Sequence, residues 1–78
     1  MNFDTLEGKQ TGDRIKAVVD ASGYSVQAAA EAAGLNRQTV YHWIHGRRSP
    51  SAGSLLQLFQ VLEQEVDGLR LDHLLEEG

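Results

Sequence analysis

The sequence predicts an all-α fold, because apolar residues recur at helical spacing and polar capping residues precede them. Two apolar triplets have the spacing i, i+3, i+4, namely Ile15, Val18 and Val19, then Val40, Trp43 and Ile44. Such a triplet forms a stripe along one side of a helix. No stretch of the chain is typical of a strand, and no internal repeat is present.

The first two helices are expected in the first half of the chain. Thr11 can cap a helix that runs to about Ala21, ahead of a Ser-Gly pair. Ser25 can cap a second helix from Val26 to Ala33, which is rich in alanine. Alanine is the best helix former, and its small side chain lets another helix approach closely.

A third, short helix is expected over residues 36–45. Asn36 is a good N-cap, and Gly46 stands where a C-terminal glycine belongs. Gly34 ends the second helix, so only Leu35 and Asn36 remain before the third. Such a short connection forces a sharp turn, as in a helix-turn-helix unit.

The rest of the chain is expected to enclose this unit. Pro50 prevents continuation of the third helix, and Ser51 or Ser54 can start a fourth that is apolar almost all round, as a buried hub helix would be. Residues 63–68 form a polar break, after which a last short helical segment is expected. Residues 1–10 show no periodicity and are expected to form a flexible arm. The expected organisation is therefore an arm over 1–10, a helix-turn-helix domain over 11–69, and an acidic tail over 70–78 that contributes to a dimer or partner surface.

Length and composition limit the classes of protein that fit. Seventy-eight residues make one domain, and the absence of cysteine excludes a disulfide framework and a thiolate metal site. No membrane span or signal peptide is visible, so a cytoplasmic protein with no membrane association is expected. No nucleophile–base pair, metal cluster or phosphate loop is present, so we expect neither an enzyme nor a cofactor.

The charge distribution matters more than the total. The net charge of -4 argues against nucleic acid, yet residues 32–62 contain three arginines and no acidic residue. Six acidic residues and one arginine lie in residues 63–78. A ligand responds to the local patch, so the basic middle segment remains compatible with DNA.

The outward face of the third helix carries side chains that can form hydrogen bonds: Arg37, Gln38, Tyr41, His42 and His45. A short helix anchored by Trp43, with such a face and no carboxylate, suits the reading of base edges in a major groove. His42 and His45 could also suggest a metal pair, but no cysteine or nearby acidic residue completes such a site. Arg47 and Arg48, in the loop before Pro50, suit phosphate contacts.

Residues from about 12 to 69 resemble the lambda-repressor-like, Cro/XRE-type helix-turn-helix proteins. The matching segments are Arg14-Ile15, Ser25, residues 30–35, residues 37–40, Trp43, Gly46, residues 47–51 and Leu55-Leu56. The resemblance implies a five-helix, all-α domain that binds a pseudo-palindromic operator in double-stranded DNA as a homodimer, and hence a transcriptional regulator, expected to be a repressor. It implies base contacts by Arg37, Gln38 and His42, with Tyr41 close by, and backbone contacts by Asn36, His45, Arg47 and Arg48.

Two departures from the family pattern carry expectations of their own. The family usually has a glutamine directly after the cap of the second helix, where it reaches a phosphate and braces the recognition helix, and here that residue is Val26. That contact is expected to be lost, or to be replaced in part by Gln27 or Ser25 as a backbone contact. Val19 and Ile44 stand where many members have an Arg–Glu pair, and we expect the two apolar side chains to touch.

The C-terminal leucines leave two interpretations open. Leu71, Leu74 and Leu75 could complete the core of the monomer, or they could form a self-complementary dimer or partner patch. We expect Leu69 to pack inward and some of the other three to meet a partner. The alternative functions are an antitoxin or adaptor that binds a protein through this acidic segment, and a module of the same fold that binds only protein.

Overall fold

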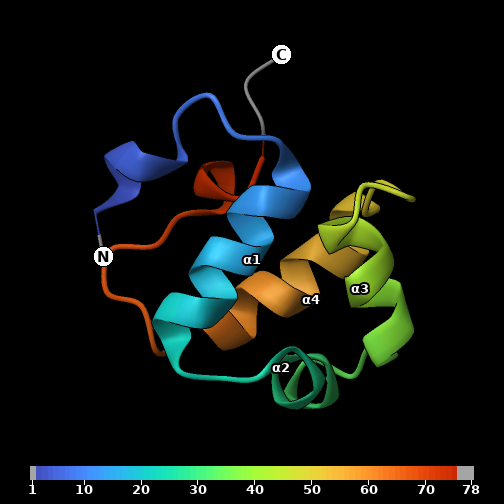
Figure 1. The fold of residues 1–78 in the computed structure, drawn as a ribbon. Coiled ribbons are helices and arrows are strands. Elements are labelled where there is room, and N and C mark those ends of the chain that lie inside the picture. Colours follow the sequence, from blue (N-terminus) through green and yellow to red (C-terminus); the bar gives the residue numbers. More distant parts are fainter. Residues whose placement is uncertain (1, 76–78) are drawn as a thin grey trace.

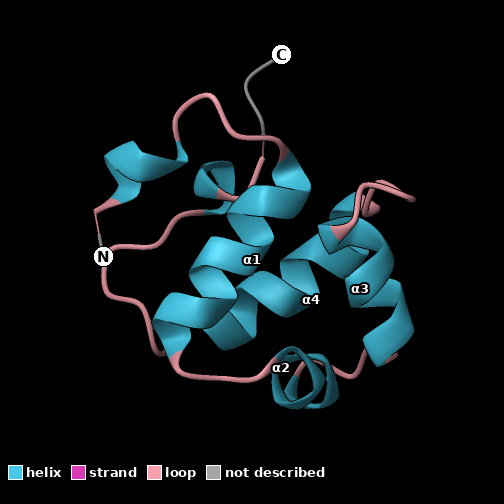
Figure 2. Ribbon diagram, in the orientation of Figure 1, coloured by secondary structure: helices cyan, strands magenta, loops and turns pink. Residues whose placement is uncertain are grey.

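A computed structural model describes residues 2–75 of the chain, and in that range it is helical without any strand (Figures 1 and 2). The elements in chain order are η1 (Phe3–Leu6), α1 (Thr11–Ser22), α2 (Val26–Ala32), α3 (Arg37–Ile44), α4 (Ala52–Leu62) and η2 (Leu71–His73). The prediction of an all-α fold is confirmed, and the first four predicted helices begin and end within two residues of the observed ones.

The expected count of five α-helices is wrong for the described residues, which form four α-helices and two short 3-10 helices. The last predicted helix is the single 3-10 turn η2, closed by hydrogen bonds such as Leu74 N to Leu71 O at 3.0 Å. Gly68, which has φ +79°, precedes this turn. The backbone hydrogen bonds of this stretch join residues three apart, as in His73 N to Arg70 O at 3.0 Å, so it forms a 3-10 turn and no α-helix.

The four α-helices surround one core. Helix α1 packs against α2, α3 and α4, and α2 packs against α3 and α4 (Figure 1). The buried side chains of these helices include Ile15, Val18, Val19, Ala29, Ala30, Val40, Trp43, Leu55, Leu58 and Leu62. Ile44 packs against the same core, so it and Val19 lie in one cluster. Helix α4 is less enclosed than predicted, because Leu56 is 41% exposed.

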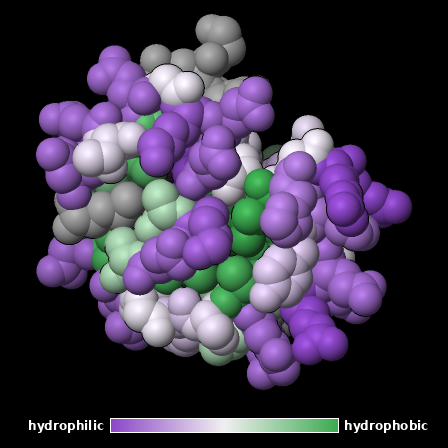
Figure 3. Space-filling view, viewed as in Figure 1, coloured by the Kyte–Doolittle hydropathy of each residue, from purple (hydrophilic) through white to green (hydrophobic). Residues whose placement is uncertain are grey.

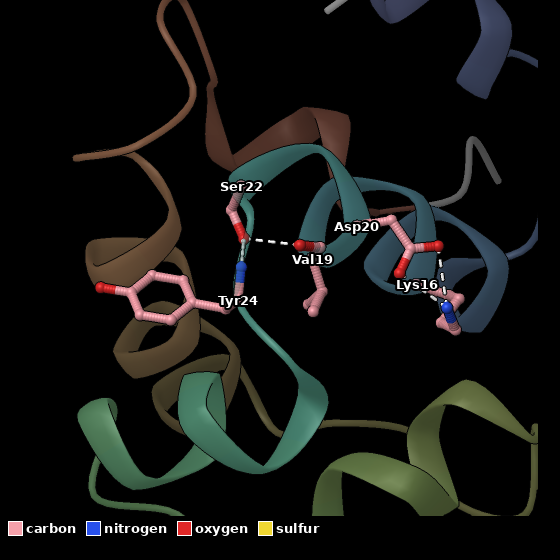
Figure 4. Close-up of polar contacts among 5 residues, drawn as sticks. All are labelled: Lys16, Val19, Asp20, Ser22 and Tyr24. Atoms are coloured by element: carbon pink, nitrogen blue, oxygen red, sulfur yellow. Dashed lines mark hydrogen bonds and ion pairs between the residues drawn. The ribbon is translucent and has the colours of Figure 1, made fainter.

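Ser22 and Ser25 form the hydrogen bonds that end α1 and start α2, and Figure 4 shows those of Ser22. The Ser22 hydroxyl donates to the carbonyl oxygen of Val19 at 2.6 Å and accepts from the backbone N–H of Tyr24 at 3.2 Å. Ser25 then caps α2, as predicted, by accepting from the backbone N–H of Ala28. Tyr24, between these two serines, packs against the core. The turn is therefore fixed by hydrogen bonds at both helix ends and by the packing of this side chain.

The turn between α2 and α3 sets the entry of α3. Gly34 has φ +73°, a conformation that glycine adopts without a steric penalty. The next backbone N–H, that of Leu35, bonds back to the carbonyl of Ala30 at 2.8 Å, as in a Schellman motif. Asn36 Oδ1 accepts from the N–H of Gln38 at 2.8 Å, which confirms the predicted N-cap.

The short elements η1 and η2, which lie near the two ends of the chain, are on the side of α1 away from α3 (Figure 1). The Phe3 ring stacks on the His73 ring with centroids 4.1 Å apart. Arg14 is buried and donates to the carbonyl oxygens of Lys9 and Leu75. Leu6 is 1% exposed, so the segment expected to be an arm packs against the domain.

The C-terminal leucines divide between core and surface. Leu69 is buried, as predicted, whereas Leu74 is 0% exposed and has no surface to offer a partner. The prediction of Leu74 as a dimer or partner residue is therefore wrong, because the monomer core already encloses it. Leu71 is half-buried and Leu75 is 43% exposed. Residues 76–78 of the predicted tail lie outside the described residues.

Candidate nucleic-acid interface

Helix α3 presents one face to the core and the opposite face to solvent. Val40 and Trp43 are buried, and Ile44 packs beside them. This arrangement confirms that Trp43 is a core residue, and it places the predicted base-reading side chains on the outside. Figure 3 shows hydrophilic residues over the outer side of α3 and hydrophobic residues between α3 and α1.

The outer face of α3 is continuous. At about 100° per residue, its five predicted side chains follow one another around one side of the helix: Arg37, Tyr41, His45, Gln38 and His42. All are exposed except His42, which is half-buried. The rings of Tyr41 and His45 stack with centroids 6.2 Å apart. The face therefore offers one guanidinium, one amide, one phenol and two imidazoles, and no carboxylate.

The residues predicted to contact phosphates lie around the two ends of α3. At the first end, the Asn36 oxygen caps the helix, so only the amide NH2 of this side chain could donate to a phosphate. At the other end, the backbone N–H of Arg47 bonds to the carbonyl of His42 at 2.8 Å, which holds the basic loop against α3. His45, Arg47 and Arg48 are exposed.

A shallow cleft lies where the basic loop meets the start of α1. Its lining consists of Gln10, Thr11, Gly12, Trp43, Gly46, Arg48 and Ser49. Arg48 therefore lies beside the positive end of the α1 macrodipole. Arg48 favours a negative group at this edge of the α3 surface, whereas the exposed carboxylate of Asp13, in the first turn of α1, offsets part of the effect of the macrodipole.

Gly12 determines how closely α1 approaches the end of α3. A Cβ atom built on Gly12 would lie 2.7 Å from the carbonyl oxygen of Ile44, and closer still to that of Trp43. Residues with a Cβ essentially never show such distances. Sequence reasoning missed this contact, although a glycine in the first turn of a helix is a signal of close packing.

Gln27 was predicted as a possible backbone contact, and the structure places it beside the first residue of α3. Its Oε1 accepts from Arg37 Nη1 at 3.3 Å, and its Nε2 donates to Glu31 Oε1 at 3.3 Å. All three side chains are exposed. Val26, the neighbour that replaces the family glutamine, is buried in the core. The packing of α2 on α3 thus links Glu31, through Gln27, to the first residue of α3.

The comparisons with known proteins agree with this geometry. A family model for helix-turn-helix proteins of the Cro/C1 type matches residues 15–69. No curated protein and no solved structure matches the chain. No helix within residues 2–75 has the length and apolar character of a membrane span. The family match covers well over half of the chain and includes the α2–turn–α3 unit described above, and the chain therefore belongs to the Cro/C1-type helix-turn-helix family of DNA-binding regulators.

Proposed function

We propose that this protein is a transcriptional repressor that binds a pseudo-palindromic operator as a homodimer, with α3 in the major groove. The observation that carries the proposal is the outer face of α3, which presents hydrogen-bonding side chains and no carboxylate while the inner face is fixed in the core. A rigid helix with such a face can read base edges, because its side chains start from defined positions. In this proposal the protein binds DNA and catalyses no reaction.

The side chains on this face have different roles in the proposal. Arg37 offers a fork that matches the O6 and N7 atoms of guanine, and Gln38 can pair with adenine. Each good pair discriminates against a wrong base by about 1–3 kcal/mol. Tyr41 and His42 follow on the same face, one turn further along the helix, and complete the set of base contacts.

The phosphate contacts fix the position of α3 in the groove. Asn36 lies at the start of the helix, and His45, Arg47 and Arg48 lie at its end. Contacts on both sides of the base-reading residues would clamp the helix between phosphates on either side of the groove. Such contacts set orientation and affinity and carry no direct base information.

The dimer surface is proposed at the C-terminal segment, where Leu75 is exposed and Leu71 is half-buried. A two-fold interface uses the same patch on both copies, so exposed leucines at one site suit it. The same patch supports the alternative function, an antitoxin or adaptor that binds another protein here. Sedimentation of the purified chain with the enriched operator distinguishes them: a chain that stays monomeric on that DNA favours the alternative.

The test is selection of binding sites from random duplex DNA at about 0.1 M salt, where electrostatic attraction is screened beyond about 10 Å. We expect an enriched palindrome whose half-sites lie about one helical turn apart. Gln38→Ala should relax one base position, whereas Gln64→Ala, an exposed glutamine beyond the end of α4, should relax none. If no duplex is enriched and only weak, salt-sensitive binding remains, the proposal is wrong.

A further inference from the structure

Three exposed side chains connect α2 to the first residue of α3. Glu31 and Gln27 are one turn apart on α2, and Arg37 opens α3. The Gln27 amide donates to Glu31 on one side and accepts from Arg37 on the other, both at 3.3 Å. Gln27 and Arg37 are ten residues apart in the sequence, and the packing of α2 on α3 brings their side chains together.

The chemistry of the two outer groups allows only one orientation of the central amide. An ionised glutamate accepts hydrogen bonds and cannot donate, whereas an arginine donates and cannot accept. The Gln27 NH2 group must therefore face Glu31, which turns its oxygen toward Arg37. Replacing the carboxylate by an amide would remove one of the two groups that fix this orientation, so the flipped amide, which cannot accept from Arg37, would become less unfavourable.

The contact leaves Arg37 able to read a base. Gln27 takes one hydrogen of Nη1, and the Nε–Nη2 edge, which forms a fork, is not used in this bond. Both bonds are long and exposed, so they bias the direction of the guanidinium without locking it. DNA can then add its own contacts to a side chain that already points one way, which reduces the ordering cost of binding.

We propose that Glu31 and Gln27 are positioning residues that direct Arg37 and so determine specificity at one operator position that neither of them touches. The inference rests on the proposed function, since it requires that Arg37 reads a base. Glu31 has a second effect, because its negative charge near the α3 face repels phosphates on every duplex alike. Its two effects therefore act on different quantities, base preference and overall affinity.

The first measurement needs no DNA. Nitrogen-15 relaxation of the Arg37 Nε–H group in the free protein reports how ordered the guanidinium is on the picosecond-to-nanosecond timescale. We expect the order to fall in Gln27→Ala and in Glu31→Gln, and to stay unchanged in the exposed controls Gln64→Ala and Glu63→Gln. If the order of the Arg37 guanidinium is unchanged in both Gln27→Ala and Glu31→Gln, these two residues do not direct Arg37 and the inference is overturned.

The second measurement repeats the site selection with the α2 variants, after Arg37→Ala has identified the operator position that Arg37 reads. We expect Gln27→Ala to lower the preference for the selected base at that position alone. The expected loss is about 2- to 10-fold, which corresponds to the net free energy of one hydrogen bond. Glu31→Gln should relax the same position and at the same time bind all duplexes a few-fold more tightly at low salt.

The outcomes separate the inference from the proposed function. If the wild-type protein enriches no duplex, the proposed function is wrong and the inference is overturned with it. If an operator is enriched but neither α2 variant changes the Arg37 position, or if all positions weaken together, the inference alone is overturned. Thermal melting of each variant confirms that the comparison is made on folded protein.

Discussion

The close approach of α1 to α3 at Gly12 predicts that a normally favourable substitution will destabilise this protein. Gly12 is the second residue of α1, where alanine would otherwise be the better helix former by up to about 1 kcal/mol. The new Cβ, however, would meet the backbone carbonyls of Trp43 and Ile44, with 2.7 Å to the second. Backbone atoms cannot rotate away as the end of a side chain can, so the two helices must separate.

The magnitude follows from two opposing terms. Inserting a methyl group into a packed contact costs about 1–3 kcal/mol, and the gain in helix propensity offsets up to about 1 kcal/mol of that. Taking about 2 kcal/mol for the first term and subtracting up to about 1 kcal/mol for the second, we expect Gly12→Ala to lower the free energy of unfolding by about 1–2 kcal/mol. For a domain of this size, that corresponds to a fall in Tm of roughly 4–15 °C.

Gly53 provides a matched control, because it is the second residue of α4 and a Cβ there would have no atom within 4 Å. Gly53→Ala should leave the stability unchanged or raise it by up to about 1 kcal/mol. Urea unfolding followed by circular dichroism at 222 nm measures both variants. If Gly12→Ala is as stable as Gly53→Ala, the close contact between α1 and the end of α3 does not require a glycine, and the predicted destabilisation is refuted.

Three further predictions follow from burial and hydrogen bonding. Leu74→Ala should cost about 2–5 kcal/mol in urea unfolding, whereas Leu56→Ala, at a leucine that is 41% exposed and outside the proposed dimer surface, should stay within about 0.5 kcal/mol; equal losses would contradict the assignment of Leu74 to the core. Arg14→Lys should cost about 1–3 kcal/mol, because one ammonium does not replace a fork that bridges two distant carbonyls, and a Tm equal to that of the wild type would count against that role. Asn36→Ala should cost about 1 kcal/mol by removing the cap of α3, and Asn36→Asp should restore most of it; the idea is refuted if both variants melt together.

The local features of the fold were predictable because their physical causes lie within a few residues. Ser25 and Asn36 cap their helices through bonds to residues two or three positions away. The apolar spacing of α3 was sufficient to place Trp43 in the core and Gln38 outside. Caps and helical periodicity depend on the sequence inside one or two turns, so they can be read without knowing how the helices pack.

The errors occurred where short stretches lack periodicity or where packing decides. Residues 1–10 show no periodic pattern, yet Leu6 is buried and Phe3 stacks on His73 from the opposite end of the chain. Leu74 and Leu75 are chemically identical neighbours, and only their surroundings make one a core residue and the other a surface residue. No composition or spacing rule distinguishes them.

The sequence by itself therefore determined the helical fold, the order of the helices, and the set of residues on the outer face of α3. The tertiary structure decided which of these residues have partners: Gln27 beside Arg37, Arg14 bonded to the carbonyl of Leu75, and Gly12 against the end of α3. These contacts join residues 10, 61 and about 30 positions apart. Their geometry depends on the angles and distances between packed helices, which result from the whole core and not from any one segment.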